Sequence, residues 1–331
     1  MYFIFSLIAL ICWSGSDLFS KLGTSQKDRY SHWHVIFAVG VVMGLHAVLT
    51  LIISPLLPPP SENAEWWRSI IYTDFKFIDF VRYMPIASIY LAAMVIGYAG
   101  LRYIELSVSS PICNSSGSLA LIICVLVGWT TLSVSEPSGV INIIGIVLIT
   151  VGIISLGMVE YYEDENIKLA RQDKSTFKYR KSIIAILIPV IYLFLDALGT
   201  VGDQFVSEQE LFEMSEYASN TAFEFTSLLF AVIAFVFVKF IKKQKFFTDG
   251  ITKKERKNLV IGAGFETVGQ IFYMSVMFSD FKAGMPMISA YCVLSVLWSR
   301  IFLKEKLSFK HYLTIFGTIA GIILLGIAEI L

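Results

Sequence analysis

Ten apolar segments, each about 20 residues long, recur along this chain of 331 residues. A helix rises about 1.5 Å per residue, so one such segment crosses the roughly 30 Å hydrocarbon core of a bilayer. We therefore predict an all-α polytopic membrane protein with ten transmembrane helices. The predicted spans lie near 2–22, 34–54, 83–103, 109–129, 139–159, 183–202, 217–239, 259–278, 284–303 and 311–330.

The composition agrees with a membrane protein. Apolar residues make up 56% of the chain and charged residues 16%, whereas a soluble domain of this length needs a more charged surface. The first segment lacks a basic N-terminal region and carries Asp17 and Lys21, so we expect a retained helix rather than a cleaved signal peptide. The four cysteines lie in apolar segments as packing residues, and no nucleotide-binding or metal-binding motif occurs. We expect no catalytic residue, metal, cofactor or use of ATP.

Positive charge is concentrated on one side of the predicted bundle. With ten crossings, alternate connections share a side, and 22 of the 26 Lys and Arg residues fall on one of the two sides. The other side has only Arg68, Lys76, Arg82 and Lys282. The positive-inside rule then predicts a multi-pass protein of the cytoplasmic membrane with both termini outside. One outer connection is acidic and contains Asp203, Glu208, Glu210, Glu213 and Glu216. We interpret it as a solvated loop, and the alternative is an outer acidic vestibule that concentrates cations.

The second half of the chain repeats the first. Glu305–Gly326 aligns without a gap on Glu136–Gly157 at an offset of 169 residues. At offsets of 175 and 179 residues, further pairs match: Tyr98 with Tyr273, Glu105 with Asp280, Pro111 with Pro286, Leu119 with Leu294, Trp13 with Tyr192, Asp17 with Asp196, and Gly23 with Gly202. We predict a first five-helix repeat at 1–159, a charged cytoplasmic linker at 160–182 and a second repeat at 183–331. Two inverted repeats are typical of secondary transporters, with the site between them. Pro111 and Pro286 are expected to begin helices four and nine.

The order and spacing of several short motifs resemble the drug/metabolite transporter (DMT) superfamily, in its ten-helix EamA-like branch. The motifs are Cys12–Asp17 with Lys21–Gly23, the short link Gly100–Pro111, Glu136 followed by Gly145, Gly152 and Gly157, and Leu303–Ser308 followed by Gly317, Gly321 and Gly326. The resemblance implies a secondary transporter of a small metabolite, with inverted repeats and alternating access. Relatives move amino acids, amines, choline, nucleotide sugars and phosphorylated sugars.

The chain departs from the family pattern in two respects. Family members commonly carry a basic residue at the start of helix two, where this chain has Val35 and Ile36. Many members also keep both termini in the cytosol, whereas the charge count of this chain favours termini outside. The two halves of an inverted repeat lie in opposite orientations, so either orientation of the whole protein in the membrane is structurally tolerable. We therefore follow the charge count.

Four acidic residues fall within predicted spans: Asp17, Asp196, Glu224 and Glu266. A charged side chain at the bilayer centre costs about 2.5–3.5 kcal/mol on insertion scales, so such residues face the bundle interior and mark a pathway. Helical spacing places further polar residues on the same faces as these acids. The candidates for substrate binding or proton coupling are Glu224, Glu266, Gln270, Tyr273, Asp196, Asp17, Trp13, Tyr90, Tyr98, Asn114, Asn220 and Ser289.

One central cavity lined by these residues suits a cation. Carboxylates supply negative charge, and aromatic faces add about 0.5–2 kcal/mol each through cation–π contact. Anionic cargo would need a Lys or Arg at mid-span, and none is evident in the sequence. The acids have a second possible use, because burial lets a carboxyl group exchange protons near neutral pH and so carry coupling protons.

Each acid also has a structural interpretation. Asp17 could pair with Lys21 one turn away, Asp196 could hydrogen-bond within the bundle, and Glu266 could pair with a basic residue at the start of its helix, Arg256 or Lys257. The aspartates occur in both repeats, which favours a role in the shared fold. Glu224 and Glu266 have no acidic counterpart in the first half, so we place cargo or proton recognition in the second half.

We predict a secondary active transporter of a small cationic or zwitterionic solute, such as a choline-like amine or an amino acid, with proton coupling as an option. One alternative is an exporter of amino acids or drugs. Another is a non-transporting membrane enzyme or assembly subunit, although the four histidines match no ligand set. The expected partners are the lipid bilayer, the solute and protons, with no nucleic acid. A monomer and a homodimer both remain open.

Overall fold

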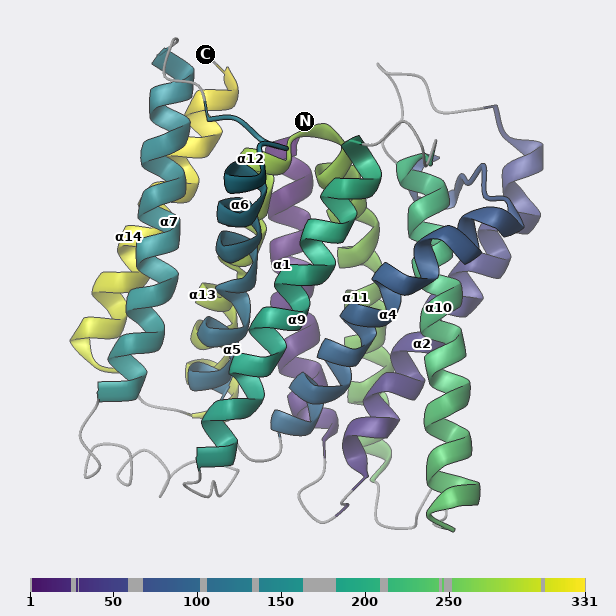
Figure 1. Cartoon of the computed structure of the whole chain (residues 1–331). Coiled ribbons are helices and arrows are strands. Elements are labelled where there is room, and N and C mark those ends of the chain that lie inside the picture. The colour runs from purple at the N-terminus through teal and green to yellow at the C-terminus, as the bar shows by residue number, and fades with distance from the viewer. Residues whose placement is uncertain are drawn as a thin grey trace.

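The computed structural model describes residues 2–24, 28, 30–58, 68–101, 106–132, 137–162, 183–208, 214–243, 246, 252–304 and 307–330. Within these ranges the regular structure is all helical, and ten helices are long and apolar enough to cross a membrane (Figure 1). The predicted fold class and number of spans are confirmed. The predicted linker falls mostly on residues outside the described ranges, so the domain boundaries stay a prediction.

In its described residues, the first half contains seven α-helices and one short 3-10 turn. They are α1 (Tyr2–Gly23), α2 (Ser31–Ile53) with the turn Ser54–Leu56, α3 (Arg68–Ile71), α4 (Phe77–Gly100), α5 (Leu106–Asn114), α6 (Ser116–Val127) and α7 (Pro137–Tyr162).

The second half follows the same order. It contains α9 (Ile183–Glu208), α10 (Glu216–Val236) extended by a π-helical turn (Phe237–Ile241), α11 (Lys253–Ser279), α12 (Phe281–Ser289), α13 (Tyr291–Trp298) extended by a second π-helical turn (Ser299–Leu303), and α14 (Phe309–Ile330).

Two helices begin earlier than their apolar segments. Helix α4 starts at Phe77, where the side chain of Asp79 accepts a hydrogen bond of 2.7 Å from the backbone N–H of Lys76. Helix α11 starts with a capping box between Thr252 and Glu255. Capping satisfies the free N–H groups of a first turn, so both helices extend beyond the apolar core.

The fourth and ninth spans are each broken near their middle. The first break lies at Ser115, between α5 and α6, and the second at Ala290, between α12 and α13. Pro111 and Pro286 lie inside the leading pieces, so the prediction that they begin these helices is wrong. At both breaks a backbone N–H bonds a carbonyl three residues back, which tightens the turn. The two breaks are 175 residues apart, the same offset as one register of the sequence repeat.

The helices of the two halves pack between one another rather than as separate bundles. Helix α1 packs against α11 as α9 packs against α4, and α2 packs against α11 as α10 packs against α4. Equivalent helices also pair directly, α2 with α10 and α7 with α14, at opposite sides of the bundle (Figure 1). Each contact has a counterpart when the halves are exchanged, as two interlocked repeats require. The inverted relation itself stays a prediction.

Small residues allow the closest of these helix contacts. In the pair of α7 and α14, a Cβ added to Gly321 would lie 2.9 Å from the carbonyl oxygen of Gly145 and 2.8 Å from Ile149. Backbones that approach this closely are typical of small-residue packing between membrane helices. Gly145 and Gly321 therefore serve as packing residues between α7 and α14.

Both termini lie at the same end of the bundle, as an even number of crossings requires (Figure 1). The chain therefore enters α4 from the terminal end and leaves it at the opposite end. These two ends are called the terminal end and the opposite end below.

Candidate functional site

A cavity of about 90 Å³ lies between the two halves. Helices α1, α4, α5 and α6 of the first half and α9 to α13 of the second half all contribute to its lining. Ten of the twelve predicted residues line it: Trp13, Asp17, Tyr90, Tyr98, Asn114, Asp196, Glu266, Gln270, Tyr273 and Ser289. The structure thus brings most of the candidates to one place, while their roles stay a prediction.

The cavity is acidic and aromatic. Three carboxyl groups line it, those of Asp17, Asp196 and Glu266, and none of the described lining residues is Lys, Arg or His. The aromatic lining consists of Trp13, Tyr90, Tyr98, Tyr192, Phe223, Tyr273 and Tyr291. A pocket lined by carboxyl groups without a described basic residue favours a cation over an anion.

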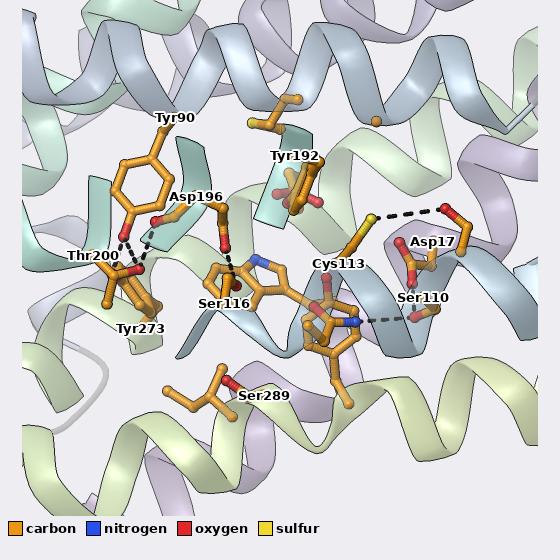
Figure 2. A pocket seen from close by; sticks show the side chains of 18 of the residues that line it. Asp17, Tyr90, Ser110, Cys113, Ser116, Tyr192, Asp196, Thr200, Tyr273 and Ser289 are labelled. Carbon is orange, nitrogen blue, oxygen red and sulfur yellow. Dashed lines mark hydrogen bonds between the residues drawn. The ribbon is translucent and has the colours of Figure 1, made fainter. Parts of the chain in front are cut away.

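Asp17 is held by hydroxyl groups from both halves. Its Oδ2 accepts hydrogen bonds from Ser110 Oγ at 2.9 Å and from Ser295 Oγ at 2.8 Å. Asn114 supports the first donor by a hydrogen bond of 3.0 Å to Ser110 Oγ (Figure 2). The ammonium group of Lys21, which is fully buried one turn further along α1, donates to the backbone carbonyl of Leu101.

Asp196 occupies the corresponding place in the second half. Its Oδ2 accepts a hydrogen bond of 2.5 Å from Ser116, the first residue of α6, directly after the break in the fourth span (Figure 2). Hydrogen bonding within the bundle, the structural interpretation of this acid, therefore occurs. The carboxyl group still lines the cavity, so this support and a binding role are compatible.

Glu266 lies in the cavity wall with Gln270 one turn away on α11. The basic residues proposed to neutralise it, Arg256 and Lys257, are exposed in the first turns of α11. At about 1.5 Å per residue, they lie roughly 13 Å or more from Glu266 along the helix axis, too far for an ion pair. Glu266 thus faces the cavity without the predicted structural partner.

Trp13 forms an aromatic wall of the cavity. Its ring centroid lies 5.0 Å from that of Tyr273 and 5.8 Å from that of Tyr291. Gly269 leaves space for the indole, since a Cβ there would lie 2.7 Å from Trp13 Nε1. The indole N–H is buried and has no hydrogen-bond acceptor among the described residues. It is therefore a polar group able to meet a bound solute.

A buried cluster of hydroxyl groups lies on the terminal-end side of the cavity, where Tyr90, Thr200 and Tyr273 belong to both the cluster and the lining. Asp203, which is 1% exposed, accepts hydrogen bonds from Tyr83 and, at 2.7 Å, from Tyr273. Tyr90 joins the cluster through a contact of 2.5 Å between its hydroxyl and that of Tyr273, and through Thr200 at 2.7 Å (Figure 2). These contacts tie α4, α9 and α11 together.

Asp203 therefore does not belong to an acidic solvated loop, and that expectation is wrong. It lies inside α9, which continues to Glu208. A sequence signal for its position exists, because Asp196, Thr200 and Asp203 follow one another at spacings of four and three residues, on one face of a helix. The predicted sixth span ends near residue 202, which assigns Asp203 to the following loop instead of to this helical face. Sequence reasoning also missed Ser110, Ser116, Tyr192 and Tyr291.

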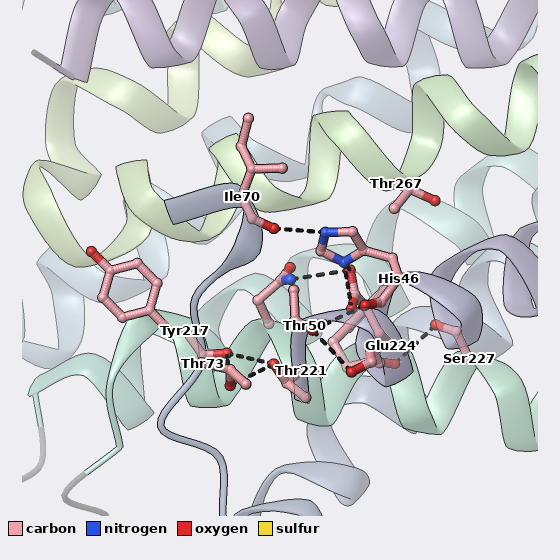
Figure 3. Close-up of polar contacts among 12 residues, drawn as sticks. His46, Thr50, Ile70, Thr73, Tyr217, Thr221, Glu224, Ser227 and Thr267 are labelled. Carbon is pink, nitrogen blue, oxygen red and sulfur yellow. Dashed lines mark hydrogen bonds and ion pairs between the residues drawn. The ribbon is translucent and has the colours of Figure 1, made fainter. Parts of the chain in front are cut away.

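Glu224 and Asn220 lie outside the cavity, in a second polar cluster with His46 of α2 (Figure 3). His46 Nδ1 lies 2.8 and 2.9 Å from the two carboxyl oxygens of Glu224, and His46 Nε2 lies 2.7 Å from the carbonyl oxygen of Ile70. Asn220 donates to Glu224 Oε1 at 3.1 Å. Glu224 is fully buried. We name these residues the His46–Glu224 cluster.

Comparison with known proteins agrees with this architecture. Residues 212–327 match the model of the EamA-like transporter family, which confirms the resemblance to that family and to the drug/metabolite transporter superfamily. No curated protein matches the chain. One solved structure, titled "Crystal structure of protein", has a TM-score of 0.59 at 11% identity, covering 98% of this chain and 95% of that chain. At this identity the likeness shows a common fold alone.

Proposed function

We propose, from the premise that the second half of this chain is an EamA-like transporter repeat, that the protein is a secondary transporter of a small cationic or zwitterionic solute. A family of this kind indicates a multi-pass membrane transporter of small solutes rather than an enzyme. The proposed cargo is a choline-like amine or an amino acid. The observation that carries this choice is the central cavity, with three carboxyl groups and no described lining residue that is basic.

The charge of the cavity selects the cargo. Buried carboxylates are costly without a counter-charge, and a bound ammonium group would supply that charge. The rings of Trp13, Tyr273 and Tyr291 would add about 0.5–2 kcal/mol each where a ring face meets the cation. A phosphorylated sugar or nucleotide sugar would instead bring negative charge against three acids. A zwitterionic amino acid needs a donor for its carboxylate, for which the free indole N–H of Trp13 is available.

The residues at the two ends of the cavity support alternating access. The cluster around Asp203 closes the cavity toward the terminal end, whereas Leu101 and Leu106, at the opposite end of α4 and the start of α5, still belong to its lining. Tyr98 and Tyr273 are equivalent in the two repeats, so a matching closure at the other end can form when the halves exchange conformations. The broken fourth and ninth spans border the cavity and provide points at which the helices can bend.

The orientation in the membrane follows from charge. We propose that the terminal end faces the outside of the cytoplasmic membrane, because the connections at the opposite end carry most Lys and Arg residues. The end of the cavity that is lined by Leu101 and Leu106 then faces the cytoplasm. A phosphatase fused to the C-terminus, active only outside the cytoplasm, should be active in intact cells. An inactive phosphatase together with a fluorescent C-terminal green fluorescent protein fusion would reverse the orientation.

Uptake into proteoliposomes tests the function. Radiolabelled choline, a panel of amino acids and a phosphorylated sugar as the anionic control would be offered to the purified, reconstituted protein. We expect uptake of an amine or an amino acid and none of the anion. Asp196→Asn and Glu266→Gln should reduce this uptake, while Glu255→Gln, a change to an α11 cap outside the cavity, should not. Uptake of the anion alone, or unchanged uptake by both cavity variants, would refute the assignment.

A further inference from the structure

We propose that the His46–Glu224 cluster is the coupling-proton site of the transporter, separate from the cargo cavity. This inference rests on the proposed transport function and assigns its driving ion. The cluster joins three segments distant in sequence: α2 through His46, α10 through Glu224, and α3 through Ile70 (Figure 3). Its ligand is a proton.

The hydrogen bonds determine how many protons the pair holds. A backbone carbonyl only accepts, so the contact of 2.7 Å with Ile70 O requires a proton on His46 Nε2. At 2.8 Å, the contact of Nδ1 with the carboxyl group requires one further proton, either on His46 or on Glu224. Both distributions leave the pair with no net charge, and this is the state compatible with full burial of Glu224.

Loss of the shared proton breaks the contact. His46 would then present the lone pair of Nδ1 to a negatively charged carboxylate, and the two groups would repel each other across a contact of 2.8 Å. The N–H or O–H bond that holds the shared proton breaks, its electron pair stays on His46 or Glu224, and the proton passes to water on one side of the membrane. Proton release therefore weakens this contact between α2 and α10, and proton uptake restores it.

The surroundings provide a route for the proton and no competing cation. A small pocket of about 10 Å³, about the space that one water molecule needs, adjoins His46 and reaches Glu216 and Tyr217 at the start of α10. The other described titratable group in its lining is Tyr72, from the segment between α3 and α4, and Asp74 lies two residues further along the chain. The α11 lining contributes Ile271, Met274 and Ser275, which do not titrate, and no described lining residue is Lys or Arg.

One helix connects the proton site to the cargo cavity. On α10, Glu224 faces His46 while its neighbour Phe223 lines the cavity and packs edge-on against Tyr90 at a centroid distance of 6.1 Å. Tyr90 in turn belongs to the cluster around Asp203 that closes the terminal end. If α10 shifts when the pair loses its proton, it would therefore move both the cavity wall at Phe223 and, through Tyr90, the cluster around Asp203.

Nitrogen NMR of the four histidines tests the proton site without any cargo. In the full-length protein in detergent, with histidine labelled with ¹⁵N, His46→Gln identifies the His46 signals. Between about pH 5 and 8, we expect a proton on Nε2 and an Nδ1 signal shifted by the proton that Nδ1 shares with Glu224, whether this proton rests on His46 or on Glu224. In Glu224→Gln, Nδ1 should resonate as an unprotonated nitrogen at the upper end of this range. Identical Nδ1 signals in the wild type and Glu224→Gln would overturn the inference.

Reconstituted protein tests whether this proton drives transport. Choline is the probe, and trapped pyranine reports the internal pH. Glu224→Gln and His46→Gln should retain choline exchange at equal concentrations on both sides, which also shows that they fold. They should lose accumulation driven by an inward proton gradient, while Glu255→Gln keeps it. Accumulation with proton entry in both variants would overturn the inference. If the wild type carries neither choline nor any other solute of the panel, the proposed function fails, and the NMR titration alone decides the proton site.

Discussion

Replacement of Asp203 by Asn should favour the conformation in which the terminal end of the cavity is open. The carboxylate of Asp203 accepts hydrogen bonds from two tyrosines, Tyr83 and Tyr273, which lie on different helices. Asn has nearly the same shape but offers one acceptor oxygen and one NH₂ group, which only donates. One tyrosine hydroxyl therefore loses its acceptor, and the remaining hydrogen bond goes to a neutral group.

The magnitude follows from the number of contacts. A hydrogen bond to a charged group contributes about 1.5–3 kcal/mol, and the substitution removes at least one of them. If the cluster forms only while the terminal end is closed, the whole loss of hydrogen-bond free energy shifts the equilibrium between the closed and open conformations of that end. Such a free energy corresponds to a change of roughly 10- to 150-fold in that equilibrium.

The native Cys113 provides the assay. It lines the cavity, while the other three cysteines, Cys12, Cys124 and Cys292, are buried elsewhere and can be replaced by Ser or Ala. A membrane-impermeant thiol reagent would be added to cells or right-side-out vesicles, where it reaches only the outer face. We expect Asp203→Asn to raise the rate of Cys113 modification about tenfold or more, in proportion to the open population.

Two results would contradict this reasoning. An unchanged modification rate in Asp203→Asn would mean that the cluster around Asp203 does not close the cavity. An equal increase in Glu255→Gln, which alters only an exposed helix cap, would mean that the assay reports general loosening. Tyr83→Phe removes one donor to the same carboxylate and should raise the rate as well, by a smaller factor.

Three further predictions concern packing, aromatic contact and pH. Gly321→Ala should lower the thermal stability by about 1–3 kcal/mol in detergent, because its Cβ would meet α7 backbone at 2.9 Å, while Gly317→Ala on the same helix has open space and should not. Trp13→Phe should weaken amino-acid transport more than choline transport, since it removes the free indole N–H but keeps a ring; equal losses for both solutes in uptake assays would contradict this. Burial and the neighbouring charge of Asp74 raise the pKa of Tyr72, outside the spans. Asp74→Asn should therefore bring the phenolate absorbance of Tyr72 to lower pH in an ultraviolet titration.

The architecture was largely predictable from the sequence. Ten segments of membrane-spanning length require ten helices whatever their arrangement, because a backbone in lipid must satisfy its own hydrogen bonds. Helical periodicity also identified the faces that carry Asp17, Asp196 and Glu266, and all three reach one cavity. Buried charge is costly in lipid, so polar faces turn inward, and this rule needs no tertiary information.

The same rule could not say which inward faces meet. Glu224 and Glu266 are both buried acids on neighbouring helices, yet one contacts His46 of α2 and the other lines the cavity. Asp203 changed from an expected loop residue to the centre of a buried cluster, because α9 extends further than its apolar segment. The number of spans and the polar face of each helix follow from local spacing along one chain. The grouping of those faces into a central cavity and the separate His46–Glu224 cluster depends on how each helix is rotated against its neighbours, and only packing between distant segments determines that rotation.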